Sequence, residues 1–344
     1  MEKLKFIPGA VDDDGAISKG WPVVLTIAGL DPTGGAGILA DIKTFEQNAV
    51  YGLAIATANT LQTDQLFVEQ SWSETGFLIR SIKTLSERFA IAAVKIGILP
   101  SLDVLEDLIA ALANYLPNAA VVWDPVFSAS AGATFFQDIK AGLPDGEKQR
   151  WRDVLTKMRL ITPNRPEAAA LAAMLIEPDI IDATAGNILN EMDNATACSN
   201  QLVASMRALS IQSGLSILLK GGHLTQHKGT DLLIIYSDSK HAGAAKNRVR
   251  KKPLVKPVLH TLVPHMASKG GFGIAGQVDN ECAKHGSGCV LSSAIIARLA
   301  YGDSLLAACT AAKIYTTGFL YSNTTLLGHH ANRKLGYALN PHIY

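Results

Sequence analysis

The stretch KHGSGCVLSSA, from Lys284 to Ala294, combines glycines, a hydroxyl group and a thiol in one short segment. Glycines let the backbone approach a ligand closely, and the apolar residues after Cys289 recur at helical spacing. The backbone N–H groups of Gly286, Ser287 and Gly288 would then lie at a helix N-terminus, which favours an anion. The same field would lower the pKa of Cys289. The alternative is a tight turn before a buried helix, with an inert cysteine.

A second glycine-rich stretch, GLDPTGGAGILADIKTF (Gly29 to Phe45), joins an apolar strand to a helix. It lacks both the Lys-Ser/Thr ending of a Walker A loop and the spacing of a dinucleotide-binding loop. We therefore expect a glycine hinge at the carboxyl edge of a sheet, where open α/β folds bind ligands. Asp41, on the helix that follows, is by itself most simply an exposed carboxylate.

Polar side chains also follow three later strands, in WDPVFSASAG, LITPNRPEA and LLKGGHLTQHKGTD. Asp124 ends the first of these strands. Asn164 and Glu167, three residues apart at a helix start, can hold the hydration shell of Mg²⁺ beside phosphates or can cap the helix as an Asn-x-x-Glu box. Lys220 either faces phosphate oxygens or is an ordinary exposed lysine at a strand end. Because all of these stretches lie at strand C-termini, together they indicate a phosphoryl-transfer site.

The elements that position these residues alternate between strand-like apolar runs and helical patterns from Trp21 onward. This alternation predicts a mostly parallel sheet with helices on both faces. The expected strands are 22–30, 52–61, 92–99, 119–126, 159–164 and 215–222, and the expected helices are 36–48, 81–89, 102–115, 166–175, 290–301 and 304–321.

The chain of 344 residues shows no composition break between two domains, so we expect a single domain over residues 21–344. Residues 1–20, with three consecutive aspartates beside glycines, are expected to form a flexible extension. Residues 241–284 are rich in glycine and lysine and lack periodicity, which predicts a long unstructured insertion of functional or mobile character.

Composition excludes several classes of function. A formal charge of +1 provides no field that would attract nucleic acid or an anionic membrane, and the basic run from Arg248 to Lys256 is interpreted as a solvated loop. The N-terminal stretch has no apolar core of signal-peptide length, and no apolar run elsewhere reaches the ~18 residues of a membrane span, so a cytoplasmic location is expected. Four cysteines without CxxC spacing indicate neither zinc nor disulfides and suit a reducing compartment.

The motifs resemble those of the ribokinase-like small-molecule kinases, and most of all the hydroxymethylpyrimidine and phosphomethylpyrimidine kinases of thiamine biosynthesis. The similar segments occur in the family order and are AGLDPTGGAGILADIKTF, ATANTLQTDQ, VKIGIL, WDPV, LITPNRPEA, LLKGGH and HGSGCVLSSAI. The resemblance implies a three-layer α/β/α sandwich that uses ATP and Mg²⁺. It implies phosphorylation of 4-amino-5-hydroxymethyl-2-methylpyrimidine and then of its monophosphate, and a homodimer or higher homo-oligomer.

The resemblance also implies roles for particular residues. Cys289 occupies the position of the catalytic base, and Gln62 would hydrogen-bond the aminopyrimidine edge. Gly35, Ala36 and Ile98 would line the pyrimidine pocket. Asp124, Asn164 and Glu167 would hold Mg²⁺ and its waters. Lys220 would face the nucleotide phosphates, and the amides of Gly286, Ser287 and Gly288 would stabilise the transferred group. Asp41 matches the family motif, which makes it a substrate-site candidate.

Two departures from the family pattern leave alternatives open. Ser130, Ala131 and Gly132 stand where a Lys-Ser-Gly is usual, and GSGC replaces the commoner GTGC. A pyridoxal or pyridoxine kinase would use the same anion hole, although Gln62 favours the aminopyrimidine. A non-catalytic pyrimidine-binding regulator would not need the full set of lysine, metal-binding and thiol groups.

Overall fold

The computed structural model describes residues 20–128, 134–136, 139, 141–177, 197–221, 229–236, 257–262 and 284–330. Within these ranges the strands form one sheet in the order β3-β2-β1-β4-β5-β6-β7-β8-β9. The strands are β1 (Val23–Leu30), β2 (Tyr51–Gln62), β3 (Phe67–Trp72), β4 (Ile91–Ile96), β5 (Ala120–Trp123), β6 (Leu160–Ile161), β7 (Ser216–Leu219), β8 (Asp231–Ile235) and β9 (Val258–Leu262).

The middle of the sheet is parallel, from β2 through β1, β4, β5 and β6 to β7. Antiparallel pairing occurs at the two ends, where β3 joins β2 and where β8 and β9 follow β7. The carboxyl ends of the parallel strands therefore share one edge of the sheet, as the sequence predicts.

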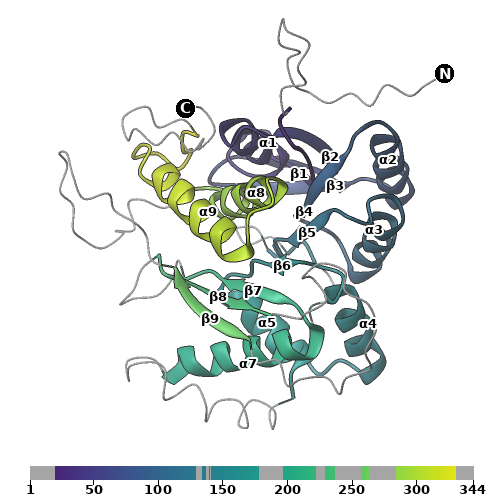
Figure 1. The fold of residues 1–344 in the computed structure, drawn as a ribbon, viewed down its shortest axis with the longest axis vertical. Coiled ribbons are helices and arrows are strands. Elements are labelled where there is room, and N and C mark those ends of the chain that lie inside the picture. Colours follow the sequence, from purple (N-terminus) through teal and green to yellow (C-terminus); the bar gives the residue numbers. More distant parts are fainter. Residues whose placement is uncertain are drawn as a thin grey trace, which may run out of the picture.

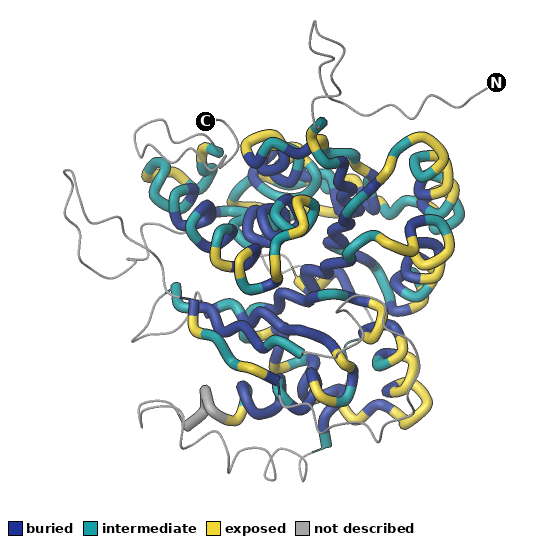
Figure 2. The backbone as a smooth tube through the Cα atoms, in the orientation of Figure 1, coloured by how far each residue is buried: buried dark blue, intermediate teal, exposed yellow. Residues whose placement is uncertain are grey.

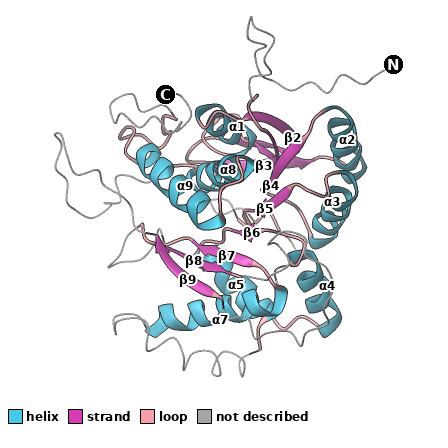
Figure 3. Cartoon of the chain, viewed as in Figure 1, coloured by secondary structure: helices cyan, strands magenta, loops and turns pink. Residues whose placement is uncertain are grey.

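Helices cover both faces of this sheet (Figures 1 and 3). They are α1 (Gly37–Gln47), α2 (Thr75–Arg88), α3 (Leu102–Tyr115), α4 (Asp145–Leu155), α5 (Arg165–Leu175), α7 (Ala197–Ser213), α8 (Ser287–Ala300) and α9 (Leu305–Leu320). Buried apolar residues of α1, α8 and α9 pack in one cluster, and those of α2, α3, α4, α5 and α7 pack in another. The expected three-layer α/β/α sandwich is confirmed.

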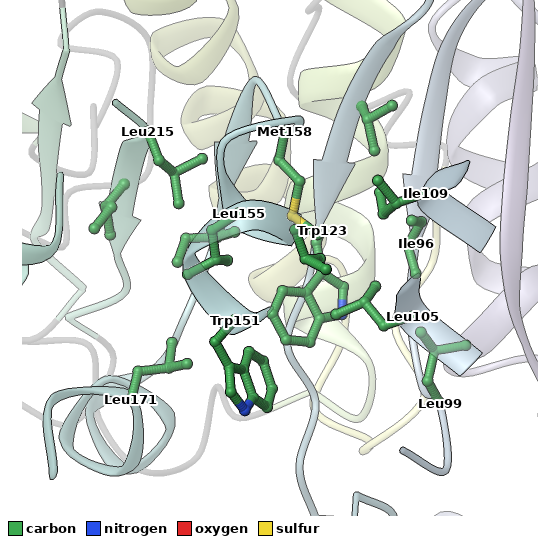
Figure 4. Close-up of a cluster of buried hydrophobic side chains, with 14 of the residues drawn as sticks. Ile96, Leu99, Leu105, Ile109, Trp123, Trp151, Leu155, Met158, Leu171 and Leu215 are labelled. Atoms are coloured by element: carbon green, nitrogen blue, oxygen red, sulfur yellow. The ribbon is translucent and has the colours of Figure 1, made fainter. Parts of the chain in front are cut away.

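The parallel strands β1, β4, β5, β6 and β7 contribute side chains to both clusters. In β1, Leu25 and Ile27 face the α2–α7 side and Val24 faces the α8 side, and all three are fully buried. Figure 2 shows the central strands as a mostly buried layer between helices that are partly exposed. On the α2–α7 side, Trp123 stacks on Trp151 with ring centroids 6.0 Å apart (Figure 4). Burial on both faces explains the nearly continuous apolar runs of these strands.

Several elements differ from the sequence expectation. The helix expected at 81–89 begins earlier, at Thr75, and β3, α4, α7 and β8 were not expected. The 241–284 segment was expected to be unstructured throughout, but β9 lies inside it and extends the sheet antiparallel to β8, so that expectation is wrong for residues 258–262. The rest of that segment apart from residues 257 and 284, and the extension expected at 1–20 apart from residue 20, lie outside the described residues. Among the helices of the described residues, none combines the length and the hydropathy that a membrane span requires.

Candidate active site

The residues expected to carry chemistry gather at the carboxyl edge of the parallel strands. Asp124 directly follows β5, Asn164 lies just after β6, and Lys220 directly follows β7. Backbone hydrogen bonds fix two of these turns, because Asp124 N–H donates to Ile96 O at 2.9 Å and Lys220 N–H donates to Pro163 O at 2.9 Å. The strand order alone therefore places the three polar turns side by side.

Lys220 forms the centre of this edge. Its Nζ donates to Oδ1 of Asp124 at 2.8 Å and lies 3.8 Å from Oε2 of Glu167. The Asp124 carboxylate is nearly fully buried and also accepts hydrogen bonds from Thr162 at 2.9 Å and from Ser292 at 3.3 Å. The alternative of an ordinary exposed lysine is wrong, since only 14% of the Lys220 side chain is exposed.

The charges at this edge shift one another's proton affinity. Burial alone would raise the pKa of Asp124, but the ammonium groups of Lys220 and Lys95 bring it below its usual range. Burial raises the pKa of Glu167 to about 7, with Lys220 opposing this rise and the Asp124 charge adding to it. The raised pKa of Glu167 shows that a further positive charge beside these two carboxyl groups would be favourable.

Asn164 and Glu167 form the capping box that the sequence left as an alternative to metal binding. Glu167 N–H donates to Oδ1 of Asn164 at 2.9 Å, and Asn164 N–H donates to Oε2 of Glu167 at 2.7 Å. The box fixes both side chains at the start of α5, where Glu167 stays within reach of Lys220. Capping uses only some of the acceptor sites of each oxygen, so it does not prevent contact with a hydrated cation.

The residues present fit a hydrated Mg²⁺ ion better than a metal held by protein ligands alone. Among the side chains that the structure describes, no group of three or more His, Cys, Asp or Glu could hold a metal ion. Mg²⁺ usually keeps several waters and binds through one or two carboxylates together with substrate phosphates. Asp124 and Glu167 supply that number of carboxylates, and the raised pKa of Glu167 marks a place where added positive charge is favourable.

The helix expected after the HGSGC stretch is present as α8, and its N-terminus faces the same edge. Gly286 is the N-cap residue, with φ of 75°, and Ser287 begins the helix. A Cβ atom at Gly288 would lie 3.2 Å from Lys220 Nζ and 3.7 Å from Asp124 Oδ2. The first turn of α8 therefore lies next to the Lys220 ammonium, and a helix N-terminus and an ammonium group both favour an anion nearby.

Cys289 is partly buried in the first turn of α8. The sequence predicted a lowered pKa for its thiol, and that prediction is wrong. Burial raises the pKa of Cys289 to about 11; the Lys95 ammonium and the Gly37 N–H lower it, whereas the carboxylates of Asp41 and Asp124 raise it further. Desolvation of the thiolate outweighs the helix field, so the thiol keeps its proton at neutral pH.

The two glycine-rich loops pack directly against each other. A Cβ atom at Gly286 would lie 2.0 Å from Gly35 O, and the positive φ of Gly286 also favours glycine. The neighbouring imidazole of His285 lies 2.9 Å from Oδ2 of Asp31. Asp31 also accepts hydrogen bonds from the backbone of its own loop, at 2.9 Å from Thr33 N–H and 2.8 Å from Ala36 N–H.

The residues expected in the pyrimidine pocket lie around this loop contact. Gln62 ends β2 and its side chain hydrogen-bonds the Asp31 carboxylate. Ile98 packs on the backbone beside the loop, since a Cβ atom at Gly29 would meet its Cδ1 at 2.3 Å. Gly35 contacts the His285 ring and Leu327, and Ala36 is the N-cap residue of α1.

Asp41 does not lie on the surface of this region. Its side chain is fully buried and pairs with the equally buried Lys95, at 2.5 Å between Oδ1 and Nζ. The interpretation of Asp41 as an exposed carboxylate is therefore wrong, and no part of the side chain is available to contact a bound substrate directly.

Sequence reasoning missed three residues of this region. Asp31 and His285 belong to the two glycine-rich motifs but were given no role, because only the fold brings these two distant residues together. Lys95 did carry a signal, because a lysine within a strand that is buried on both faces needs a partner. The segment 129–133, where a family lysine is missing, lies outside the described residues.

Comparisons with known proteins agree with this geometry. The family model described as phosphomethylpyrimidine kinase matches residues 31–253 and 266–333. The hydroxymethylpyrimidine/phosphomethylpyrimidine kinase of Aquifex aeolicus is 29% identical over 295 residues, which is 86% of this chain and 92% of that protein. The enzyme of the same description from Escherichia coli is 32% identical over 210 residues, covering 61% of this chain and 69% of that protein.

Solved structures with the same fold include kinases for two different acceptors. The pyridoxal kinase of Bacillus subtilis, solved as an ADP complex, is 23% identical with a TM-score of 0.59 and covers 87% of this chain and 92% of that one. The phosphomethylpyrimidine kinase of Clostridium difficile is 24% identical with a TM-score of 0.55 and covers 86% and 98% of the two chains. At these identities the likeness establishes the fold.

Proposed function

Because the chain belongs to the phosphomethylpyrimidine kinase family, we propose that it phosphorylates 4-amino-5-hydroxymethyl-2-methylpyrimidine, and then the resulting monophosphate, at the expense of ATP. The chain is a phosphotransferase, and its relatives are hydroxymethylpyrimidine/phosphomethylpyrimidine kinases. The product of the two steps is the pyrimidine diphosphate used in thiamine biosynthesis. ATP as the donor is supported by the kinases of the same fold that were solved with ADP or AMP-PCP.

One observation carries this proposal. Lys220 Nζ lies 2.8 Å from the Asp124 carboxylate and 3.2 Å from the Cβ position of Gly288 at the N-terminus of α8. A cation, a helix N-terminus and two carboxylates thus converge at one point of the sheet edge. This combination suits phosphoryl transfer, because cationic groups and N–H donors neutralise the negative charge of the transferred group and carboxylates bind its metal counterion.

The mechanism follows from these positions. Phosphoryl transfer passes through a loose transition state, so positioning and charge stabilisation contribute more than deprotonation of the acceptor. Lys220 and the N–H groups of Gly286, Ser287 and Gly288 stabilise the charge on the transferred group. Asp124 holds the Lys220 ammonium in place, and Thr162 and Ser292 hold the carboxylate of Asp124.

Mg²⁺ belongs to this proposal through Asp124, Asn164 and Glu167. The carboxylates and the amide would hold the ion through its waters, and the bound ion would neutralise phosphate charge. Asn164 and Glu167 are fixed for this task by their mutual hydrogen bonds at the start of α5. Glu167, whose pKa is about 7, would be deprotonated by the approach of such a cation.

Cys289 is proposed as the proton acceptor for the hydroxyl of the pyrimidine, late in the transfer and without forming a covalent intermediate. With a pKa of about 11, the thiol is protonated at neutral pH and must lose this proton before it can accept another. Its thiolate is then a stronger base than an ordinary cysteine thiolate. The reaction should therefore become faster as the pH increases.

On the acceptor side, Gln62 would hydrogen-bond the aminopyrimidine, and Gly35, Ala36 and Ile98 would line its pocket. The Asp31 carboxylate supports this assignment, because it is hydrogen-bonded by Gln62 and by Ala36 N–H and so links both to the loop before α1. Asp41, which was a substrate-site candidate, has no exposed surface and is assigned a supporting role.

We also propose a cytoplasmic enzyme whose residues 21–344 act as one kinase domain and which forms a homodimer or a higher homo-oligomer. Three exposed apolar residues at the edge of the sheet support self-association. Leu61 lies on β2, Leu66 on the turn between β2 and β3, and Val68 on β3. The near-neutral charge gives no reason to expect nucleic acid as a partner.

The test is ATP consumption by the purified protein with Mg²⁺, measured with hydroxymethylpyrimidine, its monophosphate and pyridoxal as separate acceptors. Turnover on both pyrimidines and loss of turnover in Lys220→Met are the expected results. Turnover on pyridoxal alone would support the proposed chemistry but contradict the proposed pyrimidine substrate. Binding of the pyrimidine without any turnover would contradict the proposed kinase activity and favour a non-catalytic regulator.

A further inference from the structure

Behind Cys289 lies an ion pair that the proposed mechanism does not use. Lys95, near the carboxyl end of β4, and Asp41, in α1, both have side chains with 0% exposure, and their charged atoms are 2.5 Å apart. Neither group reaches solvent, so neither contacts ATP or the acceptor directly. The pair belongs to the layer between the sheet and the helices that carry the two glycine loops.

The carboxylate of Asp41 ties three elements together. Its Oδ1 accepts a hydrogen bond from Ser293 of α8 at 2.7 Å, and its Oδ2 accepts one from Thr26 of β1 at 2.6 Å. Ser293 stands one helical turn after Cys289, and Asp41 stands one turn after Gly37, whose N–H hydrogen-bonds the thiol. The pair therefore holds both segments that contact the sulfur atom.

A buried ion pair of this kind is a poor device for stability. Its desolvation penalty is large, and apolar replacements of such pairs are often neutral or stabilising. A pair at this position is better explained by what lies next to it. The charged groups that face Cys289 are Lys95 of β4, Asp41 of α1, Asp124 after β5 and Lys220 after β7.

We propose that Lys95 and Asp41 are positioning residues that fix the first turn of α8 and set the charge around the Cys289 sulfur atom. The consequence for catalysis rests on the proposed function, whereas the effect on the thiol does not. Lys95 acts as the counterion of the thiolate, and Asp41 both orients Lys95 and weakens its effect on the sulfur. The two residues thus act on Cys289 in opposite directions.

The shifts in proton affinity agree with this arrangement. Burial is the largest influence on the Cys289 thiol and raises its pKa; among the neighbouring charges Lys95 lowers the pKa most, and Asp41 and Asp124 raise it. In return, burial alone would lower the pKa of Lys95, and Asp41, Cys289 and Asp124 together raise it. Lys95 therefore remains charged next to the thiol.

The test measures the rate at which iodoacetamide alkylates Cys289 between pH 7 and pH 10, with the modified peptide quantified by mass spectrometry. Lys95→Met should slow alkylation at pH 8 by about tenfold, because one pKa unit corresponds to a tenfold change in thiolate. Asp41→Asn should accelerate it several-fold, since Lys95 then has Asp124 and the thiolate as its remaining opposite charges. This assay needs no ATP turnover, so its outcome is independent of the kinase proposal.

Lys148→Met is the matched control. Lys148 is also a largely buried lysine paired with a carboxylate, that of Glu177, but it lies in α4 on the other face of the sheet. Its variant should alkylate at the wild-type rate. Equal rates in all variants, or a change in the same direction for Lys95→Met and Asp41→Asn, would overturn the proposal. If Lys95→Met does not fold, the nearly isosteric Asp41→Asn provides the test by itself. An alkylation rate of Asp41→Asn at or below that of the wild type would then overturn the proposal.

Discussion

The Nε2 atom of His285 lies 2.9 Å from the Asp31 carboxylate, and this contact joins two loops that are more than 250 residues apart in the chain. One loop precedes α1 and is proposed to bind the pyrimidine, and the other precedes α8 and is proposed to form the anion hole. Next to this contact Gly286 packs on Gly35 with no space for a side chain. The two loops, and with them the proposed acceptor and phosphate sites, therefore form one packed unit.

The first prediction concerns Asp31. Burial alone would raise its pKa, but hydrogen bonds from His285, Thr33 and Gln62 hold the pKa well below its usual range. A carboxyl group of this kind stabilises the fold above its unfolded pKa of about 3.9, and the stability is lost as the pH falls toward the folded value. Asp31→Asn should therefore cost about 2 kcal/mol at pH 7 and progressively less below pH 4, measured by urea unfolding.

The control for Asp31 is Asp103→Asn. Asp103 also pairs with a cation, Arg150, but 79% of its side chain is exposed. Its loss should change stability by less than about 1 kcal/mol. A cost for Asp31→Asn that is equally small at pH 7, or that grows as the pH falls, would contradict the role of the carboxylate.

The second prediction compares two glycines with positive φ. Gly286→Ala would place a Cβ atom 2.0 Å from Gly35 O, whereas Gly302→Ala, at φ of 86°, would meet no atom within 4 Å. Both changes impose backbone strain of about 1–2 kcal/mol, but only Gly286→Ala must also separate the two loops. We expect Gly286→Ala to lose at least about 3 kcal/mol and most of its kinase activity, and Gly302→Ala to retain its activity. Unfolding curves and initial rates check both; equal losses would show that the loop contact is unimportant.

The fold was largely predictable because local patterns determine most of it. Buried parallel strands read as apolar runs, and α3 was expected with its observed bounds, since Ser101 caps its start. Two of the missed elements have a weak local pattern. The helix α4 is mostly polar and buries its face through Lys148 and Trp151, and β9, at the sheet edge, has Leu262 as its single buried residue.

The positions of the candidate site residues were predictable from the sequence, but their protonation states were less so. Motifs at strand ends located Asp124, Lys220 and the α8 N-terminus, because parallel topology brings strand ends together. The pKa of Cys289 depends on burial and on Lys95 and Asp41, which are distant in the sequence. No local pattern reports that balance, and the helix N-terminus considered alone gave the wrong sign.

The third prediction separates capping from metal binding at Asn164. Asn164→Ala removes the cap of α5, and Ser304→Ala removes the cap of α9, where Ser304 accepts a hydrogen bond from Ala307 N–H at 3.3 Å. Each change should cost about 1 kcal/mol of stability. Only Asn164→Ala should also raise the Mg²⁺ concentration that gives half-maximal rate, by several-fold. A Mg²⁺ dependence that stays at the wild-type value would leave Asn164 with capping alone.

The fourth prediction concerns the pH dependence of turnover. If the Cys289 thiolate accepts the proton of the acceptor hydroxyl, the turnover number should rise through pH 7 to 10, because the thiol pKa is about 11 and the thiolate fraction grows about tenfold per pH unit in this range. Cys289→Ala should lower the turnover number at pH 9 by at least about tenfold and flatten the profile. The measurement is the initial rate with saturating ATP and hydroxymethylpyrimidine across this range.

Cys309→Ala is the control for this profile, since Cys309 is a buried cysteine of α9 whose thiol pKa is raised well above its usual range by burial and by Asp231. Its variant should keep both the rate and the slope of the wild type. A turnover number of Cys289→Ala within about twofold of wild type at every pH would remove the thiol from the reaction. Catalysis would then rest on Lys220 and the α8 N-terminus alone, which a loose transition state permits.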